Sequence, residues 1–354
     1  MSLQDAADET QFLTDNGVPS PALSRGSVNR RRAVLALAAL APWSAITARS
    51  QAPRAMPRIA VLTSGSSANA RTRLDAFRKG MEELGYVEAR NVHYEMRSAN
   101  GQLDLLREYA LELARDADVI VSASAHTTRA LHEASVSIPV VMVAVEDPVA
   151  EGFARSLAHP GGNYTGLSAN ILDHAPRYLE LLSQAAPRLA RLALLANPSN
   201  PTYRAFRARM ESAAYRAGAK AIVVLEASTP EQLETAFPFL GEDVPDGVMV
   251  MYDTMLYSQR LRVIELARDT RRPFIYPQRA YVEAGGLMSY GPQPEQNYRR
   301  AATYVDRILK GAQPRDMAIE PPARFELVIN RAAARGLGVQ LPPDFLRKAD
   351  KIIG

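Results

Sequence analysis

The chain has 354 residues, of which 47% are hydrophobic and 23% are charged, and it contains no cysteine. This composition is typical of globular proteins with a large core, and the length predicts about two domains. The absence of cysteine excludes disulfides, thiolate metal sites, a cysteine nucleophile and a lipid anchor on an amino-terminal cysteine. The net charge of +4 is too small to indicate a nucleic-acid partner.

The amino-terminal region has the pattern of an export signal. The basic cluster Arg30–Arg32 precedes an apolar run, Ala33–Ala41, and small residues follow up to Ser50. These are the parts of a secretory signal, and the paired arginines are typical of the twin-arginine type. We therefore expect residues 1–50 to be a disordered leader plus an export signal that is cleaved near Ser50. An uncleaved membrane anchor is the alternative, although Pro42 interrupts the apolar run.

From residue 57 onward, short β-prone runs alternate with helical patterns. Strands are expected at residues 58–62, 92–96, 119–121 and 138–143, and helices at residues 71–84, 103–114 and 125–132. Strands separated by helices of this length require crossover connections. The first half of the chain therefore predicts a parallel sheet that is covered on both faces.

The stretch Ala144–Ser168 is expected to join two lobes, because the same alternation starts again after it. It combines a short helical piece at Pro148–Leu157, a helix-breaking cluster at His159–Asn163 and a β-prone segment at Tyr164–Ser168. We expect the hinge at five residues: Gly162, Asn163, Tyr164, Thr165 and Ser289.

The second half repeats the scheme. Strands are expected at residues 192–195, 221–225, 248–251 and 273–276, with helices at 178–184, 230–240 and 255–269 and a further helix that ends at Ala217. Residues 285–291 are expected to cross between the lobes, and helix 295–309 to return to the first lobe. Residues 325–330 and a terminal helix at 343–352 are expected to make a third crossing.

The predicted fold is therefore α/β, with two doubly wound, Rossmann-like parallel-sheet lobes joined by a three-crossing hinge. One lobe is expected to contain residues 57–168 and 289–320, and the other residues 169–288 and 321–354.

Polar residues at the strand ends are the candidate ligand contacts, because ligands of open α/β sheets bind beyond the carboxyl ends of the strands. In the first lobe they are Ser64, Gly65, Ser122, Ser124, Glu146 and Asp147. In the second lobe and at the crossing they are Asn197, Asn200, Tyr252, Asp253, Tyr276, Arg279 and Tyr290. Hydroxyls, amides and aromatic rings suit a small polar or aromatic metabolite in a cleft between the lobes.

Each candidate also has a structural alternative. Serines at strand ends are often helix caps, Asp147 can cap the segment that follows it, and Asn200 before a proline can form a turn. The three tyrosines can be core residues. Arg279 can pair with Glu283 one helical turn later.

Motifs for catalysis or cofactor binding are not evident. The segment Ser64–Ser67 lacks both the G-x-G-x-x-G pattern and the P-loop lysine, and no G-x-S-x-G elbow occurs. No two of the five histidines lie three or four residues apart, which argues against a helical metal pair. His126 is interpreted as a surface histidine. We expect no cofactor, no metal and no enzymatic activity.

Eight stretches carry a family resemblance. They are Phe77–Tyr86, Asn91-Val92, Asp147-Pro148, Ser156–Asn163, Tyr276-Pro277, Val282–Gly291, Arg307–Ala312 and Phe325–Asn330. In these stretches the chain resembles the ABC-transporter substrate-binding proteins of the type I periplasmic-binding-protein fold. It is most similar to the branch associated with the uptake of amino acids, including tryptophan and tyrosine.

The resemblance covers the chain from Pro57 to its end. It implies a ligand captured in the interlobe cleft by hinge closure, with a membrane permease and an ATPase as partners. Together with the signal pattern and the missing lipobox cysteine, it implies a freely periplasmic protein. We expect a monomer.

Two expected ligand loops depart from the family pattern. Residues Ser122–Thr128 stand where the family usually has a glycine-containing turn, and Tyr252–Met255 replaces a more usual Asp-Pro pair. The usual amino-acid ligands therefore do not transfer directly. A secreted sensor that presents its ligand to a membrane receptor and an α/β enzyme remain alternatives. A ligand-controlled repressor would need a DNA-binding motif where the signal pattern lies.

Overall fold

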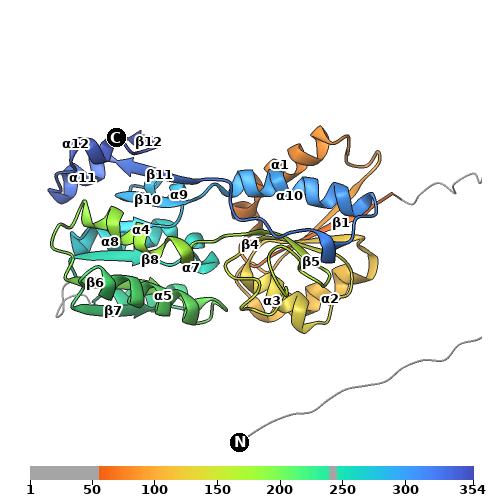
Figure 1. The fold of residues 1–354 in the computed structure, drawn as a ribbon, viewed down its shortest axis with the longest axis horizontal. Helices are drawn as coiled ribbons and strands as arrows, with labels where there is room; N and C mark the ends of the chain where they lie inside the picture. Colours follow the sequence, from red (N-terminus) through yellow and green to blue (C-terminus); the bar gives the residue numbers. More distant parts are fainter. Residues whose placement is uncertain (1–55, 239–244) are drawn as a thin grey trace, which may run out of the picture. The chain divides into compact units, whose positions relative to one another are not determined.

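The computed structural model describes residues 56–238 and 245–354, which form two parallel-sheet lobes (Figure 1). The first sheet has five strands in the order β2-β1-β3-β4-β5, and the second has seven in the order β12-β11-β10-β9-β8-β6-β7. The predicted leader and export signal at residues 1–50 lie outside the described residues. No helix in the described part of the chain is both long and apolar enough to cross a membrane.

The first sheet is entirely parallel. Its strands are β1 (Arg58–Thr63), β2 (His93–Ser98), β3 (Val119–Ser122), β4 (Val140–Val145) and β5 (Tyr164–Ser168). Its covering helices are α1 (Ser67–Glu83), η1 (Leu103–Leu105), α2 (Leu106–Asp116), α3 (Ala125–Glu133) and α10 (Pro294–Leu309).

Each face of the first sheet has its own apolar cluster, because successive side chains of a strand point to opposite faces. Ile59 and Val61 pack with residues of α1 and α10, whereas Ala60 and Leu62 pack with residues of α2 and α3. The helices α1 and α10 lie side by side although they come from opposite ends of the chain (Figure 1). Their approach requires Gly80, where a Cβ atom would lie 2.8 Å from the carbonyl oxygen of Arg299.

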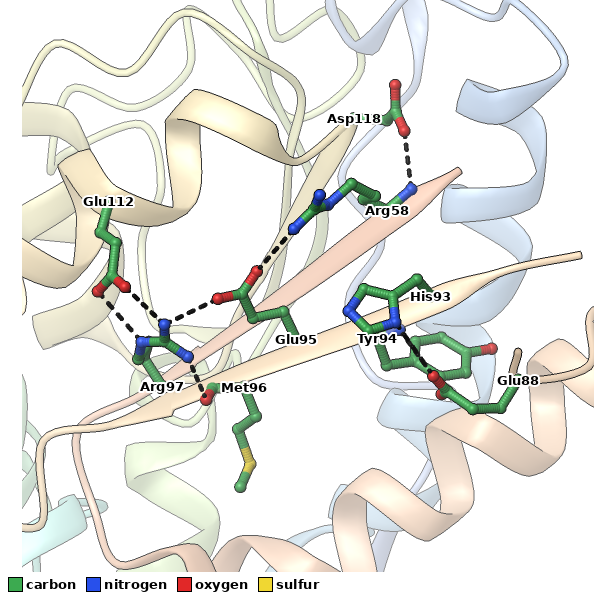
Figure 2. Close-up of polar contacts among 9 residues, drawn as sticks. All are labelled: Arg58, Glu88, His93, Tyr94, Glu95, Met96, Arg97, Glu112 and Asp118. Atoms are coloured by element: carbon green, nitrogen blue, oxygen red, sulfur yellow. Dashed lines mark hydrogen bonds and ion pairs between the residues drawn. The ribbon is translucent and has the colours of Figure 1, made fainter. Parts of the chain in front are cut away.

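Strand β2 is an edge strand whose exposed side carries paired charges (Figure 2). Glu95 lies 3.5 Å from the guanidinium of Arg58 and 2.8 Å from that of Arg97. The Nε atom of Arg97 also donates to Glu112 of α2 at 3.1 Å. Charges along an edge strand oppose pairing with the edge of another sheet.

The second sheet is parallel except for one pair, β10 and β11, which is antiparallel. Its strands are β6 (Arg191–Ala196), β7 (Ala221–Glu226), β8 (Gly247–Val250), β9 (Phe274–Tyr276), β10 (Met288–Pro292), β11 (Phe325–Asn330) and β12 (Lys351–Ile353). The helices that follow its strands or precede them are η2 (Leu172–His174), α4 (Ala175–Ser183), α5 (Tyr203–Arg216), α6 (Pro230–Ala236), α7 (Thr254–Ser258), α8 (Arg260–Thr270), α9 (Arg279–Glu283), α11 (Arg331–Leu337) and α12 (Pro343–Leu346).

The described chain passes between the lobes three times. It crosses between β5 and η2, between β10 and α10, and between η4 (Pro314–Asp316) and β11. The predicted hinge residue Ser289 lies inside β10, where it pairs with Tyr276 and Val328 of the second sheet. The second crossing therefore begins after Pro292.

The four predicted hinge residues Gly162 to Thr165 also belong to the first lobe. The Asn163 side chain donates to the carbonyl oxygens of Val136 and Ile138, both at 2.8 Å. Tyr164 and Thr165 begin β5, and the Thr165 hydroxyl donates to the carbonyl oxygen of Met317 at 2.7 Å. The first crossing therefore comes after Ser168.

Two predicted helices are also wrong. Residues 148–157 form turns, because the Asp147 carboxylate accepts the Ala150 N–H at 3.0 Å and Gly152 has a left-handed φ of +80°. The terminal helix ends at Leu346, and residues 351–353 join the sheet as β12. The Asp350 carboxylate, which accepts the Leu327 N–H at 2.8 Å, fixes that strand beside β11.

Candidate functional site: the interlobe cleft

A small cavity of about 20 Å³ lies where the two lobes meet. The first lobe contributes residues after β3 and at the end of β4, and the second contributes residues after β6 and β8. The lining residues are Ser124, Ala125, His126, Ala144, Glu146, Asn200, Thr202, Tyr252, Asp253 and Thr254. The carboxyl ends of parallel strands therefore converge there. A cavity of this size holds about one water molecule.

Asp253 is the central group of the second-lobe half, and only 2% of it is exposed. Its Oδ2 atom accepts the side-chain amides of Asn197 at 3.1 Å and Asn200 at 2.8 Å. Its Oδ1 atom accepts the Leu256 N–H at 3.0 Å and so caps α7. The sequence predicted all three polar residues, and the structure brings them together in one network.

The two asparagines are fixed in turn by the backbone after β6. The Oδ1 atoms of Asn197 and Asn200 accept the N–H groups of Ser199 and Thr202, both at 2.9 Å. Asn200 therefore forms a turn, as its structural alternative proposed, and also lines the cleft. Both asparagine side chains are therefore bonded to the backbone on one side and to the Asp253 carboxylate on the other.

Glu146 is the corresponding carboxyl group of the first lobe. Its Oε2 atom accepts the Ile171 N–H at 2.8 Å, whereas Oε1 is buried without a hydrogen-bond partner. Burial raises the pKa of Glu146 to about 8, although hydrogen bonds from the backbone of Ile171 and Leu172 act in the opposite direction. The carboxyl group is therefore largely protonated at neutral pH and can donate a hydrogen bond.

His126 contributes to the cleft, and its interpretation as a surface histidine was wrong. It is only 8% exposed, and its Nε2 atom is buried without a partner. Burial lowers the pKa of His126, while Asp253 and a hydrogen bond to the backbone of Ser199 act in the opposite direction. Its place in the first turn after β3 was the signal, because that end of the strand faces the other lobe.

Arg73, which the sequence did not single out, joins the lobes at the rim. From α1 its Nη2 atom donates to Gln278 Oε1 at 2.9 Å, and its guanidinium lies 4.5 Å from the ring centroid of Tyr257. Burial lowers the pKa of Arg73, but neighbouring tyrosines, Tyr252 first, outweigh this and the pKa is raised. An arginine within a helix carries no motif that would have revealed this role.

Gly65, which the sequence did predict, lies where the loop after β1 comes close to the loop after β8. A Cβ atom there would lie 2.9 Å from Cγ2 of Thr254 in the second lobe. The predicted serines of the first lobe make their side-chain hydrogen bonds within that lobe. Ser64 and Ser124 share a hydroxyl–hydroxyl hydrogen bond of 3.0 Å.

Of the three predicted serines, only Ser124 is a helix cap, as its structural alternative proposed. Ser124 caps α3 in a reciprocal capping box with Thr127 and also lines the cavity. The Ser122 hydroxyl bonds to those of Thr127 and Thr128, both at 2.7 Å, and does not line the cavity. Asp147 caps the turn after β4.

The last three predicted residues also lie outside the lining of the cavity. Tyr276 is a core residue of the second lobe, 1% exposed and stacked on Tyr281 at 4.9 Å. Arg279 pairs with Glu283 at 3.1 Å, as its alternative proposed. Tyr290 packs at the crossings, with its hydroxyl 3.4 Å from Nδ1 of His174.

Comparison with known proteins settles the family. The model of the ABC transporter substrate binding protein family matches residues 58–353. The chain belongs to this family. The predicted family and its solute-binding function are therefore confirmed.

Similar proteins support the same fold. A tyrosine-binding protein of Clostridioides difficile (strain R20291) is 24% identical over 265 residues, which cover 75% of this chain and 76% of the relative. The structure of a conserved domain protein from Vibrio cholerae matches with a TM-score of 0.78 and 25% identity, covering 84% of this chain and 99% of that one. The structure of an ABC domain from Streptococcus pneumonia in complex with L-Trp matches with a TM-score of 0.77 and 22% identity, over the same shares. These structures confirm the α/β fold with parallel-sheet lobes.

Membership of the family defines the general role of the chain. Its members bind a solute for an importer, so its partners are a small molecule and a permease, and such proteins are normally exported. The family consists of binding proteins rather than enzymes. In the described part of the chain, no group of three or more His, Asp or Glu side chains is placed to hold a metal ion.

Proposed function

We propose that this substrate-binding protein captures an amino acid or a similar aromatic metabolite in the interlobe cleft and delivers it to a permease driven by an ATPase. The observation that carries the proposal is the pair of unlike carboxyl groups in one cavity, Asp253 and Glu146. Each matches one end of an α-amino acid, which has an ammonium and a carboxylate on neighbouring atoms.

The two groups would take opposite parts in recognition. Asp253 already accepts two amide N–H groups and is suited to attract an ammonium as a further donor. Glu146, whose pKa is about 8, is suited to donate its proton to a ligand carboxylate. Tyr252 adds an aromatic side chain to the lining. The L-Trp complex and the tyrosine-binding relative support a ligand of this class.

A thermal-shift screen of the purified protein tests the proposal. L-tryptophan and L-tyrosine are compared with tryptamine, indole-3-propionate, nucleosides and sugars. A ligand at 100 to 1,000 times its dissociation constant stabilises the fold by about 3–4 kcal/mol, which is a shift of several degrees. We expect an amino acid to give this shift and the analogues that lack one charged group to fail. A shift with sugars or nucleosides alone would contradict the proposal, and mass spectrometry of the denatured protein would reveal a ligand carried through purification.

We also propose that binding closes the lobes by movement at the three crossings, and that the protein acts as a monomer. The interlobe contacts of Arg73 and the close approach of Gly65 support closure. Small-angle scattering should show a smaller radius of gyration at saturating ligand and the mass of one chain. An unchanged radius at saturation would exclude closure.

We propose further that residues 1–50 direct twin-arginine export, with cleavage near Ser50 and a periplasmic product. The support is the sequence pattern Arg31-Arg32 before the apolar run. Replacing both arginines with lysine should leave the protein in the cytoplasm with an uncut amino terminus. Normal export of that variant, seen by cell fractionation and amino-terminal sequencing, would favour the general secretory route.

A further inference from the structure

A second and much larger cavity lies in the second lobe, remote from the cleft. Its volume is about 570 Å³, against about 20 Å³ for the cleft, and the two share no lining residue. It is formed by the end of α8, the start of β9, the turn before β10, the end of β11 and α11. The cleft lies at the carboxyl ends of the parallel strands, whereas this cavity lies at the amino ends of β9 and β10.

The base of this cavity is apolar. Ile264, Phe274, Tyr276 and Leu287 are all buried and all line it. Glycines widen it, because Gly336 lines it and a Cβ atom added there would meet no atom within 4 Å. The volume lies within the range of about 300–1,000 Å³ that is usual for small-molecule sites.

Three arginines, Arg268, Arg271 and Arg272, line the same cavity, which we call the arginine cavity. Among the described residues none of the three has an acidic partner, whereas Arg262 on the same helix as Arg268 pairs with Glu265 at 2.6 Å. The Arg268 guanidinium extends over the turn before β10, where its Nη2 atom would lie 3.5 Å from a Cβ atom on Gly285.

Arg272 gives the clearest sign of a missing partner. Its Nε atom is buried and has no hydrogen-bond acceptor. A buried guanidinium N–H without an acceptor is unfavourable, so such groups are normally satisfied. Guanidinium groups bind carboxylates through two parallel hydrogen bonds, which a small anion in the cavity would supply.

We propose that the arginine cavity is a second ligand site, for a small molecule that has a carboxylate head and an apolar body. The head would lie among Arg268, Arg271 and Arg272, and the body on Ile264, Phe274 and Leu287. Because every element that lines the cavity belongs to the second lobe, the site is complete in both the open and the closed protein.

Isothermal titration calorimetry with octanoate, and with 1-octanol as its uncharged counterpart, tests the proposal on the whole exported chain. We expect octanoate to bind and 1-octanol to bind at least tenfold more weakly. Arg268→Gln and Arg272→Gln should each weaken octanoate binding about tenfold, and Gly336→Leu should abolish it by filling the cavity. The matched control is Arg209→Gln, an exposed arginine of the second lobe, which should bind as the unchanged protein does.

Two results would overturn the proposal. One is the absence of octanoate binding, or binding that is equal in the unchanged protein and in both the Arg268 and Arg272 variants. The other is loss of octanoate binding in Asp253→Ala, because this would place octanoate in the cleft. Circular dichroism of each variant shows whether it is folded, and the Arg268 and Arg272 variants keep the test valid if Gly336→Leu does not fold.

Discussion

Burial gives the Glu146 carboxyl group a much higher pKa in the folded state than in the unfolded state. The pKa of the folded carboxyl group is about 8, against an ordinary value of 4.5. The folded state therefore binds the proton more tightly than the unfolded state does. The stability that this provides is complete below about pH 4.5 and is lost as the pH rises through about 8.

We predict that Glu146→Gln removes this pH dependence. Between pH 5 and 8 the unchanged protein should lose up to about 1.4 kcal/mol per pH unit from this group, and the variant should not. Urea unfolding at each pH measures the difference. Glu133→Gln, at an exposed glutamate, is the control, and curves for Glu146→Gln that run parallel to those of the unchanged protein would rule out the role of Glu146.

Asp253 serves both stability and binding, so its substitution must separate the two. Asp253→Ala removes a helix cap, which costs about 1 kcal/mol, and leaves two buried amides without their acceptor. Asp253→Asn keeps an oxygen for the Leu256 N–H but removes the charge. We predict that Asp253→Asn loses about 1–2 kcal/mol of stability and at least tenfold in affinity for an amino-acid ligand. Calorimetry and urea unfolding measure both, and unchanged affinity would remove Asp253 from the site.

The link from α1 to the second lobe depends on one side chain, Arg73. Arg73→Met removes the hydrogen bond to Gln278 and the contact with the Tyr257 ring. Cation–π contacts contribute about 0.5–2 kcal/mol, so we predict a loss of roughly 2- to 30-fold in ligand affinity. The unliganded variant should also have a larger radius of gyration. Arg71→Met, at an exposed position of the same helix, is the control, and equal behaviour of the two variants would mean that Arg73 does not hold the lobes together.

The loops after β1 and β8 meet at Gly65 and Thr254. We predict that Gly65→Ala weakens ligand binding about tenfold, because its Cβ atom would lie 2.9 Å from Cγ2 of Thr254 and would hold the lobes apart. Thr254→Ser removes that methyl group, so the double variant should regain affinity. If the double variant binds as weakly as Gly65→Ala alone, the clash is not between these two atoms.

At the scale of helices and strands, local patterns predicted most of the fold. Strand β6 is a run of apolar residues that is buried on both faces, which is the pattern the sequence showed at residues 192–195. The sequence did not predict β12, because that strand exists only through pairing with β11 and the contacts of Asp350. Pairing between distant segments leaves no local pattern.

The sequence also pointed to several residues that the structure brings together in the candidate site. Asn197, Asn200 and Asp253 follow strands directly, so the rule of strand ends was sufficient to find them. His126 and Arg73 were missed because their burial depends on the opposite lobe. Tyr276 was wrongly chosen, because a tyrosine at a strand end has the same local pattern whether its ring enters the cleft or the core.

At the scale of the whole described chain, neither lobe is a continuous segment. The first sheet is complete at Ser168, but its apolar cluster also needs Tyr298 and Val305 from α10. The second sheet has β6 to β10 in sequence, yet its edge is formed by β11 and β12, which follow the third crossing.

This interleaving determines when each lobe can complete its apolar core during synthesis. A ribosome releases the strands of the first lobe long before α10, so the apolar cluster that contains Phe77 and Met81 of α1 stays incomplete until residues 294–309 emerge. The second lobe waits longer still, because its apolar cluster also contains Leu327, Ile329 and Phe345. The nascent chain therefore presents apolar surface during nearly all of its synthesis, which is the condition under which chains aggregate or are bound by chaperones.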